Sequence, residues 1–250
     1  MAPEEDGIWR EEIRIRSYEV DFARQATLEG LCRLFLEAAW NHAESLGAGF
    51  GHLAAQNRFW VLVRLRIRVD RYPRWGDNFV LNTWPRAGKG IFALREFELT
   101  DREGDLFVAG SSAWVVLDGT TKKLQRIEKM LDAIRTGPDR CAMGKEPGKV
   151  PPCRGPTRVT RGVQYTDIDL NGHVNSGRYV AWLMDSYSFE FHQKYQVRSF
   201  EINYTGETKG AETVSIRSHE DSDGLWSHSI VSASELEVCR ARVFWAPREP

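Results

Sequence analysis

Long hydrophobic runs are absent from this sequence of 250 residues, and no run approaches the roughly 18 apolar residues of a membrane-spanning helix. The first residues, MAPEEDGIWREE, lack the apolar core of a signal peptide. An excess of one charge is also absent, because 34 Lys and Arg residues are balanced by 35 Asp and Glu residues. A general attraction to nucleic acid is therefore not expected. These absences predict a soluble, cytoplasmic protein that neither spans a membrane nor binds nucleic acid.

Cysteine pairs and metal-binding spacings are absent too. The four cysteines form no CxxC pair, which predicts reduced thiols: Cys32, Cys141, Cys153 and Cys239. The six histidines show no HxxxH spacing, so a metal site is not expected. The glycine-rich segment GAGFG lacks the GxGxxG form of a nucleotide-binding loop. We therefore expect neither a metal nor another cofactor.

What the sequence does contain is the same pattern twice. Apolar residues recur at helical spacing from Thr27 to Leu46, and Gly47 is a natural end for that helix. A strand pattern precedes the helix at residues 13–18, and strand patterns follow it at 59–72, 79–84, 92–100 and 106–117. The second half predicts a helix at 175–194 and strands at 158–165, 199–204, 212–218, 225–232 and 237–245. This order predicts an α+β fold with two antiparallel sheets, each wrapped around a long helix.

The predicted domains are residues 1–138 and 157–250, joined by a linker rich in Pro and Gly at 139–156. An overlay of the halves at an offset of about 146 pairs four residues near the helix starts. The pairs are Asp21 with Asp167, Ala23 with Asp169, Gln25 with Asn171 and Thr27 with His173. In this overlay the first half lacks the acid and the imidazole of the second half.

The segment from Tyr165 to Asp185 carries the strongest functional signal. Asp169, Asn171 and His173 occupy alternate positions, so they point the same way from an extended chain. A helix start with Asn175 or Ser176 as N-cap follows at once. Polar groups next to the positive end of a helix suit chemistry on a carbonyl. The simpler interpretation is that Asp169 and Asn171 are capping residues.

At these residues the chain resembles the acyl-acyl carrier protein (acyl-ACP) thioesterases of plant plastids and bacteria. The similarity covers nearly the whole chain. It rests on IRSYEVD, ATLEGLCRLFLEAAWNH, VDRYPRWGD, Thr83-Trp84, SSAWVVLD, DIDLNGHVNSGRYVAW, and Tyr204 with Glu207. The resemblance implies a tandem (double) hot-dog fold in which the first half holds the acyl chain and the second half is catalytic. A plant-type transit peptide is missing, which points to a bacterial-type member.

The resemblance also implies the site residues. The DxNxH motif of the family falls on Asp169, Asn171 and His173, and its downstream carboxylate falls on Glu207. The Cys that follows this Glu in plant members is Thr208 here, so a cysteine nucleophile is not expected. Thr208 could replace it only with an activating base in reach.

Hydrolysis of a thioester needs a positioned water, a base and donors for the oxyanion. Glu207 or Asp169 is the predicted base or its activator, since a partly apolar cleft tends to raise a carboxyl pKa toward neutrality. Direct attack by either carboxylate stays open. His173 and Asn171 would hold the water and the substrate or relay the proton. Backbone amides of Val174 or Asn175 are the predicted oxyanion site.

These features predict hydrolysis of fatty acyl-ACP to release a free fatty acid. Two alternatives are an acyl-CoA thioesterase of the same fold and a non-catalytic acyl-binding protein. The implied partner is acyl carrier protein, an acidic protein with a phosphopantetheine arm, and the protein would be a monomer or a homodimer. Two basic clusters could attract this partner or be solvated strand faces: Arg64, Arg66, Arg68, Arg71 and Arg74; and Lys122, Lys123 and Arg126.

Overall fold

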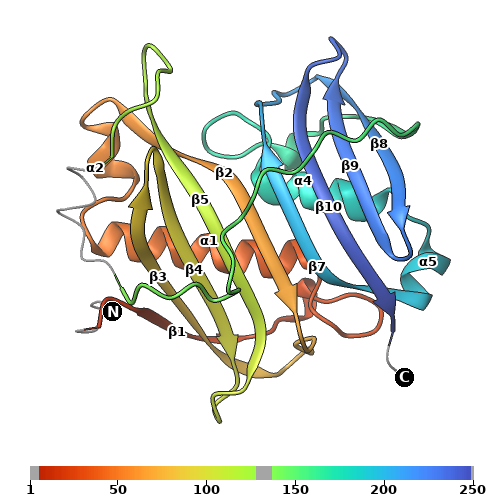
Figure 1. Ribbon diagram of the computed structural model, residues 1–250, viewed down its shortest axis with the longest axis horizontal. Coiled ribbons are helices and arrows are strands. Elements are labelled where there is room, and N and C mark those ends of the chain that lie inside the picture. Colours follow the sequence, from red (N-terminus) through yellow and green to blue (C-terminus); the bar gives the residue numbers. More distant parts are fainter. Residues whose placement is uncertain (1–5, 128–136, 249–250) are drawn as a thin grey trace. The chain divides into compact units, whose positions relative to one another are not determined.

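A computed structural model describes residues 6–127 and 137–248 of the chain (Figure 1). The chain divides into two compact units, residues 1–147 and 148–250. The boundary between the units thus lies inside the segment predicted as linker. The outer ends of the predicted domains, residues 1–5 and 249–250, lie outside the described residues, as do residues 128–136.

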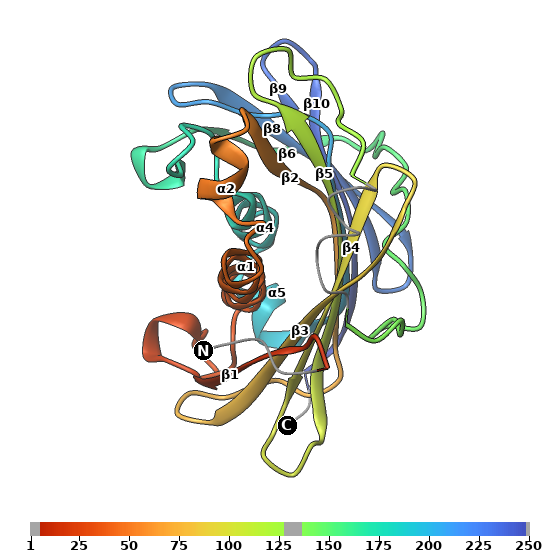
Figure 2. The ribbon, with the colours of Figure 1, turned by 90° about the vertical axis from the view of Figure 1, so that its left-hand side faces the viewer.

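The first unit is an antiparallel sheet with a long helix. Its elements are β1 (Trp9–Arg14), the 3-10 helix η1 (Ser17–Glu19), α1 (Leu28–Ser45), α2 (Phe50–Ala54), β2 (Arg58–Val69), β3 (Asn78–Lys89), β4 (Phe92–Thr100) and β5 (Leu106–Asp118). Pairing gives the strand order β1-β3-β4-β5-β2. Figure 2 shows α1 on one face of this sheet. The predicted strand at residues 13–18 is misplaced, since β1 lies earlier and η1 occupies part of that range.

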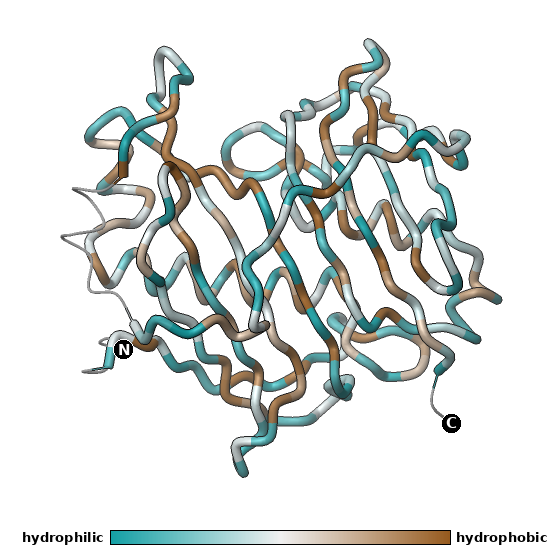
Figure 3. The backbone as a smooth tube through the Cα atoms, in the orientation of Figure 1, coloured by the Kyte–Doolittle hydropathy of each residue, from teal (hydrophilic) through white to brown (hydrophobic). Residues whose placement is uncertain are grey.

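Alternation of side chains fixes the faces of the strands. On β2 the apolar residues Leu65, Ile67 and Val69 are buried, and the arginines between them lie on the other face. Figure 3 shows hydrophobic and hydrophilic residues succeeding one another along the strands. A register shift between Leu62 and Arg64 marks a bulge. The sequence pattern therefore predicted which face packs against the helix.

Helix α1 begins and ends as predicted to within one residue. The Thr27 side chain accepts a hydrogen bond from the amide of Gly30, and Gly47 follows the helix with a φ of +67°. Below the helix, Phe35 stacks on Phe97 of β4 with ring centroids 4.8 Å apart. A Cβ at Gly110 of β5 would lie 2.5 Å from the Phe35 ring, so only glycine admits this close packing.

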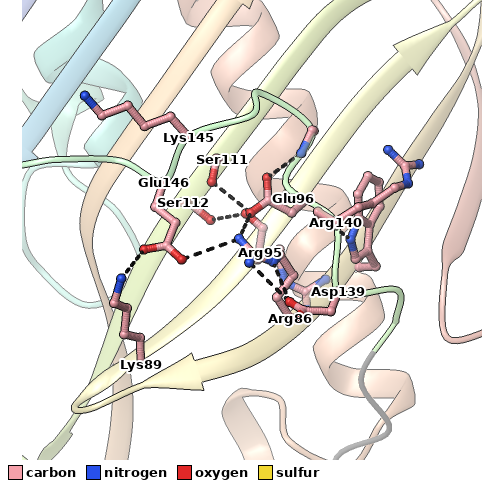
Figure 4. A network of polar contacts seen from close by, with 12 residues as sticks. Arg86, Lys89, Arg95, Glu96, Ser111, Ser112, Asp139, Arg140, Lys145 and Glu146 are labelled. Atoms are coloured by element: carbon pink, nitrogen blue, oxygen red, sulfur yellow. Dashed lines mark hydrogen bonds and ion pairs between the residues drawn. The ribbon is translucent and has the colours of Figure 1, made fainter.

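The end of the first unit, residues 137–147, is fixed to the face of β4 that points away from α1 (Figure 4). Glu96 is 0% exposed there and accepts hydrogen bonds from the Ala142 amide, the Ser111 hydroxyl and Arg86. Burial raises the pKa of Glu96, although these hydrogen bonds oppose the rise. The predicted linker is thus held in part by a buried ionic network rather than being a loose tether.

The second unit repeats the arrangement. Its elements are β6 (Thr157–Gly162), the 3-10 helix η2 (Tyr165–Asp167), α4 (Ser176–Asp185), α5 (Phe189–Lys194), β7 (Tyr195–Tyr204), β8 (Thr213–Ser222), β9 (Leu225–Ser232) and β10 (Glu237–Pro247). Its strands are antiparallel in the order β7-β10-β9-β8-β6. The two units confirm the α+β tandem hot-dog fold.

The single long helix predicted at residues 175–194 is wrong. It is two helices, α4 of 10 residues and α5 of 6 residues, with a break between them. The Ser186 hydroxyl bonds back to the Leu183 carbonyl, and the Ser188 side chain accepts from the Phe191 amide as the N-cap of α5. Serine side chains compete with helical backbone bonds in this way, which an apolar stripe does not reveal. No helix in the described part of the chain is long and apolar enough to cross a membrane.

Candidate active site

His173 and Glu207 lie in contact in the second unit. His173 belongs to the loop between η2 and α4, and Glu207 follows β7. The His173 Nε2 atom lies 3.2 Å from Glu207 Oε2. Backbone pairing brings the two segments together, because the Val174 amide donates to the Thr208 carbonyl at 2.9 Å. The side chains are 28% and 48% exposed, so the pair is open to solvent.

Asp169 shapes this loop. Its Oδ1 atom accepts the backbone amides of Asn171 at 2.8 Å and of His173 at 3.4 Å. Its own amide donates to the His173 carbonyl, and Gly172 between them has a φ of +77°. This is the local side-chain to backbone bonding typical of Asp in turns. The carboxylate therefore holds the backbone of Asn171 and His173 in place, and Asn171 is exposed.

The prediction that the backbone amides of Val174 or Asn175 form the oxyanion site is wrong. The Val174 amide donates to Thr208, and the Asn175 amide donates to the Asp167 carbonyl at 2.8 Å. Both donors are occupied by the bonds that join this loop to its neighbours. The Asn175 side chain is the N-cap of α4, accepting from the Gly177 amide. The sequence showed a helix start, but not that the loop bonds use these two amides.

Asp167 is an anchor that the sequence did not single out. It is 0% exposed and accepts hydrogen bonds from Arg178 Nε at 2.8 Å and Trp182 Nε1 at 3.3 Å. Burial alone would raise the pKa of Asp167. The Gln164 amide and Arg178 outweigh burial, so the pKa lies below its usual range. Asp167 thereby ties the loop to the first turns of α4.

The structure gives no support to a nucleophile at Thr208 or at a cysteine. The Thr208 side chain is 0% exposed, whereas the side chain of its neighbour Glu207 is exposed to solvent. The hydroxyl of Thr208 is therefore buried away from the exposed carboxylate. Cys32, Cys153 and Cys239 are buried and Cys141 is partly buried. Burial raises the pKa of all four thiols, which keeps them protonated. The carboxylate of Glu207 and the imidazole of His173 are the exposed polar groups in contact at the site.

The first unit contains the same loop at a different register from the predicted one. Asp21 accepts the amides of Ala23 and Gln25, as Asp169 accepts those of Asn171 and His173. The true offset is therefore 169 − 21 = 148 residues, and the overlay at about 146 is wrong. The acid is present in both halves.

The partner segments of the two loops correspond as well. The Ala26 amide donates to the Pro73 carbonyl in the first unit, as Val174 donates to Thr208 in the second. The residue before Pro73 is Tyr72, so Tyr72 stands where the second unit has Glu207. Ala23 and Gln25 stand where it has Asn171 and His173. Only the second unit thus combines the amide, the imidazole and the carboxylate.

Within the described ranges, no group of three or more His, Cys, Asp or Glu side chains is placed to hold a metal ion. Two units, each with a helix on an antiparallel sheet, and a histidine–carboxylate pair in the second unit define a tandem hot-dog protein with a polar site. Family models make the assignment specific. Residues 7–134 match the acyl-ACP thioesterase N-terminal domain, and residues 155–247 match its C-terminal domain. The chain belongs to the acyl-ACP thioesterase family.

Individual relatives agree with this assignment. A chloroplastic acyl-[acyl-carrier-protein] hydrolase of Cuphea viscosissima is 27% identical over 98% of this chain and 64% of its own length. The chain therefore spans about 64% of that relative. An acyl-ACP thioesterase structure from Bacteroides thetaiotaomicron is 28% identical, with a TM-score of 0.89 over 97% of this chain and 99% of that one. The 12:0-ACP thioesterase from Umbellularia californica shares the fold at 24% identity, with a TM-score of 0.83 over 96% and 98% of the chains.

Proposed function

We propose that this protein hydrolyses the thioester of fatty acyl-ACP and releases a free fatty acid. The observation that carries the proposal is the contact between His173, in the loop before α4, and Glu207, in the segment after β7. The first unit has Gln25 and Tyr72 at the corresponding positions. A duplicated scaffold with reactive groups in one copy is expected where that copy performs the chemistry. Membership in the family supports the substrate.

The base in this proposal is Glu207. Asp169 is occupied with the amides of its own loop, whereas the Glu207 side chain is exposed and meets only His173 among the described residues. The Glu207 carboxylate takes a proton from water as the water oxygen attacks the thioester carbon. Collapse of the tetrahedral intermediate breaks the carbon–sulfur bond, and the same proton passes to the leaving thiolate. His173 fixes the carboxylate through Nε2.

Asn171 is the proposed donor to the oxyanion. Its carboxamide lies on the exposed side of the loop, and its position is fixed by the bond from its backbone amide to Asp169. A side-chain amide can supply the hydrogen bond that the occupied amides of Val174 and Asn175 cannot. Loss of one such donor typically lowers the rate by about 10²–10³.

Acyl carrier protein is the proposed partner, and the two basic clusters differ in the contacts that their side chains make. Arg64 and Arg66 donate to the Pro147 and Lys145 carbonyls, so they hold the end of the first unit. Arg68 and Arg71 form ion pairs with Asp70 and Asp105. Lys122, Lys123 and Arg126 are exposed. We assign the attraction of the acidic partner to this second cluster. The protein would act in the cytoplasm as a monomer or a homodimer.

Hydrolysis of a panel of acyl-ACPs, with the matching acyl-CoAs beside them, tests the proposal. Release of fatty acid from acyl-ACP at rates well above those from acyl-CoA, falling as salt is added, is expected. Equal and salt-insensitive rates would assign the protein to acyl-CoA hydrolysis. Bound lipid without turnover of either substrate would make it an acyl-binding protein and contradict the proposal.

A further inference from the structure

The first residues of the second unit, 148–156, form a segment that lies across the outer face of its sheet (Figure 1). The outer face is the one opposite the buried core. On β10 the buried Ala241 and Val243 alternate with Arg240 and Arg242, so the two arginines lie on the outer face. We call residues 148–156 the covering segment.

One row of outer-face side chains is paired with the covering segment. Asn203, Arg240 and Ser229 lie directly opposite one another on β7, β10 and β9, so they share this face. The Asn203 side chain accepts from the Val150 amide at 2.8 Å, and the Ser229 hydroxyl accepts from the Cys153 amide at 2.8 Å. Arg240 donates to the Val150 carbonyl at 3.5 Å. Each of these three side chains therefore has a partner in the segment.

The next row along the same strands contains an arginine without a partner. Its members are Glu201 of β7, Arg242 of β10 and Ser227 of β9. Glu201 accepts from the Gly148 amide at 2.6 Å, and Ser227 donates to Asp221. The Arg242 guanidinium forms no hydrogen bond or ion pair with the described residues, and its Nε atom is buried.

Two prolines lie where the covering segment passes this arginine. Pro151, Pro152 and Arg242 line the same cavity. A proline has no backbone N–H and an apolar side chain, so the segment presents neither a carboxylate nor a polar side chain there. The covering segment therefore pairs with the neighbouring row but leaves Arg242 without a counter-ion.

The cavity beside Arg242 has a volume of about 360 Å³. Small-molecule sites typically occupy about 300–1,000 Å³, so this space suits a small ligand. Arg154 of the covering segment lies in its wall with Arg242, and Pro151, Pro152 and Leu225 supply apolar surface. The carboxylate of Asp221 also lies in the wall and already accepts from Ser227. Two arginines thus face the cavity with one carboxylate.

The outer face of the first unit provides a contrast. Arg86 lies there against residues 137–147 and meets three carboxylates, those of Glu96, Asp139 and Glu146 (Figure 4). A charged group that is partly removed from water without a partner is costly. The chain supplies the partners of Arg86 itself, whereas an anion from outside can complete Arg242, because a cavity adjoins it.

We propose that this cavity binds a small organic anion, whose carboxylate or phosphate head is paired by Arg242 and Arg154. A guanidinium offers two parallel N–H donors that match either head group. The apolar part of the ligand would lie against the two prolines and Leu225. No residue of the candidate active site lines this cavity, so the inference does not depend on the proposed function.

The test measures binding of benzoate, phenyl phosphate and the neutral analogue benzamide at constant ionic strength, by calorimetry and thermal shift. Wild type is expected to bind at least one of the two anions and to gain Tm from it, but not from benzamide. Arg242→Met should weaken binding by about 10-fold or more, since hydrogen bonds to a charged head are lost. Its fold should be preserved, because the change removes an unpaired charge. Arg242→Lys keeps the charge without the planar fork and should weaken binding by less.

Arg217→Met is the matched control. Arg217 lies opposite Ser229 on the same outer face and pairs with Glu235, but it does not line the cavity. This variant removes the same charge and should change the affinity by less than about twofold.

The outcomes separate the possibilities. Tighter binding of benzoate would identify the head as a carboxylate, and tighter binding of phenyl phosphate would identify it as a phosphate; both support the inference. Absence of binding by either anion to wild type would overturn it. Equal affinity in wild type and Arg242→Met, or equal weakening in Arg217→Met, would also overturn it, because the anion would then lie elsewhere or respond only to overall charge. Hydrolysis of acyl-ACP is measured separately, so failure of either proposal leaves the other standing.

Discussion

The loops that precede α1 and α4 have nearly the same backbone and different chemistry. Each contains a 3-10 helix, an Asp that accepts two amides of the loop, and a residue with positive φ, Arg24 at 59° and Gly172 at 77°. Each ends at a side-chain N-cap, Thr27 or Asn175. What both loops keep is therefore needed for the shape.

What differs between the loops is the part that can react. Asn171, His173 and Glu207 are replaced in the first unit by an alanine, a glutamine and a tyrosine. The comparison separates the DxNxH motif into two roles: its acid builds the loop in both units, and its amide and imidazole belong to the second unit alone. A motif taken from one loop in isolation would assign all its polar residues to the chemistry.

Among the residues of the two loops, the largest effect is expected at the imidazole. His173→Ala should lower kcat on acyl-ACP by about 10²–10⁴, because Glu207 loses the group that fixes it. The matched substitution in the first unit, Gln25→Ala, should leave kcat within a few-fold of wild type. Steady-state hydrolysis and circular dichroism of both variants provide the measurement. Equal losses in the two variants would remove the distinction between the loops.

The shared acids give a smaller and more symmetrical effect on stability. Asp169→Ala and Asp21→Ala should each lower the free energy of unfolding by about 1 kcal/mol, as expected for lost side-chain to backbone bonds. Only Asp169→Ala should also reduce kcat, because only its loop carries His173. Chemical denaturation and kinetics are measured on the same preparations. A larger loss of activity in Asp21→Ala would reverse the assignment of the two units.

The buried acid Asp167 predicts a pH dependence of stability. Its pKa is lower in the folded state, so its contribution is present above the unfolded pKa and is lost as pH falls through the folded value. Asp167→Asn should lower the free energy of unfolding by about 1–3 kcal/mol at pH 7. The difference between variant and wild type should shrink at pH values below the ordinary range of Asp. A difference independent of pH would contradict this role of the carboxylate.

The smallest effect is expected at Thr208. Thr208→Val keeps the size of a side chain that is 0% exposed and should change kcat by less than about twofold. The loss of most activity, with the Tm preserved, would assign a reactive hydroxyl to this position. The same assay on His173→Ala sets the scale of a true loss.

The sequence predicted the helices and strands better than the helix break and the loop register between them. Alternation on β2 and the stripe of α1 follow from burial of one face, so both were found. The serines that divide α4 from α5 act through hydrogen bonds that no periodicity reports. The offset of about 146 paired Asp21 with another aspartate by residue type, while the true register follows from amide bonds to Asp21 and Asp169.

At the candidate site, too, the sequence predicted the residues but not the hydrogen bonds between segments. The motif predicted that Asn171, His173 and Glu207 act together, and the structure brings His173 and Glu207 into contact. The helix start at Asn175 gave no sign that the amides of Val174 and Asn175 are occupied. The hydrogen bond between Arg95 of β4 and His42 of α1 could not be predicted from the sequence, because 53 residues separate the two and only the packing of α1 on β4 brings them together.

The central claim is that Glu207 acts as the base in a loop whose copy lacks it. The most direct measurement is kcat for acyl-ACP hydrolysis by Glu207→Gln, which keeps the size of the side chain and removes its basicity, beside Tyr72→Phe in the first unit. The account predicts a loss of about 10²–10⁴ in Glu207→Gln and near-normal turnover in Tyr72→Phe. Turnover near the wild-type rate in a folded Glu207→Gln would contradict it.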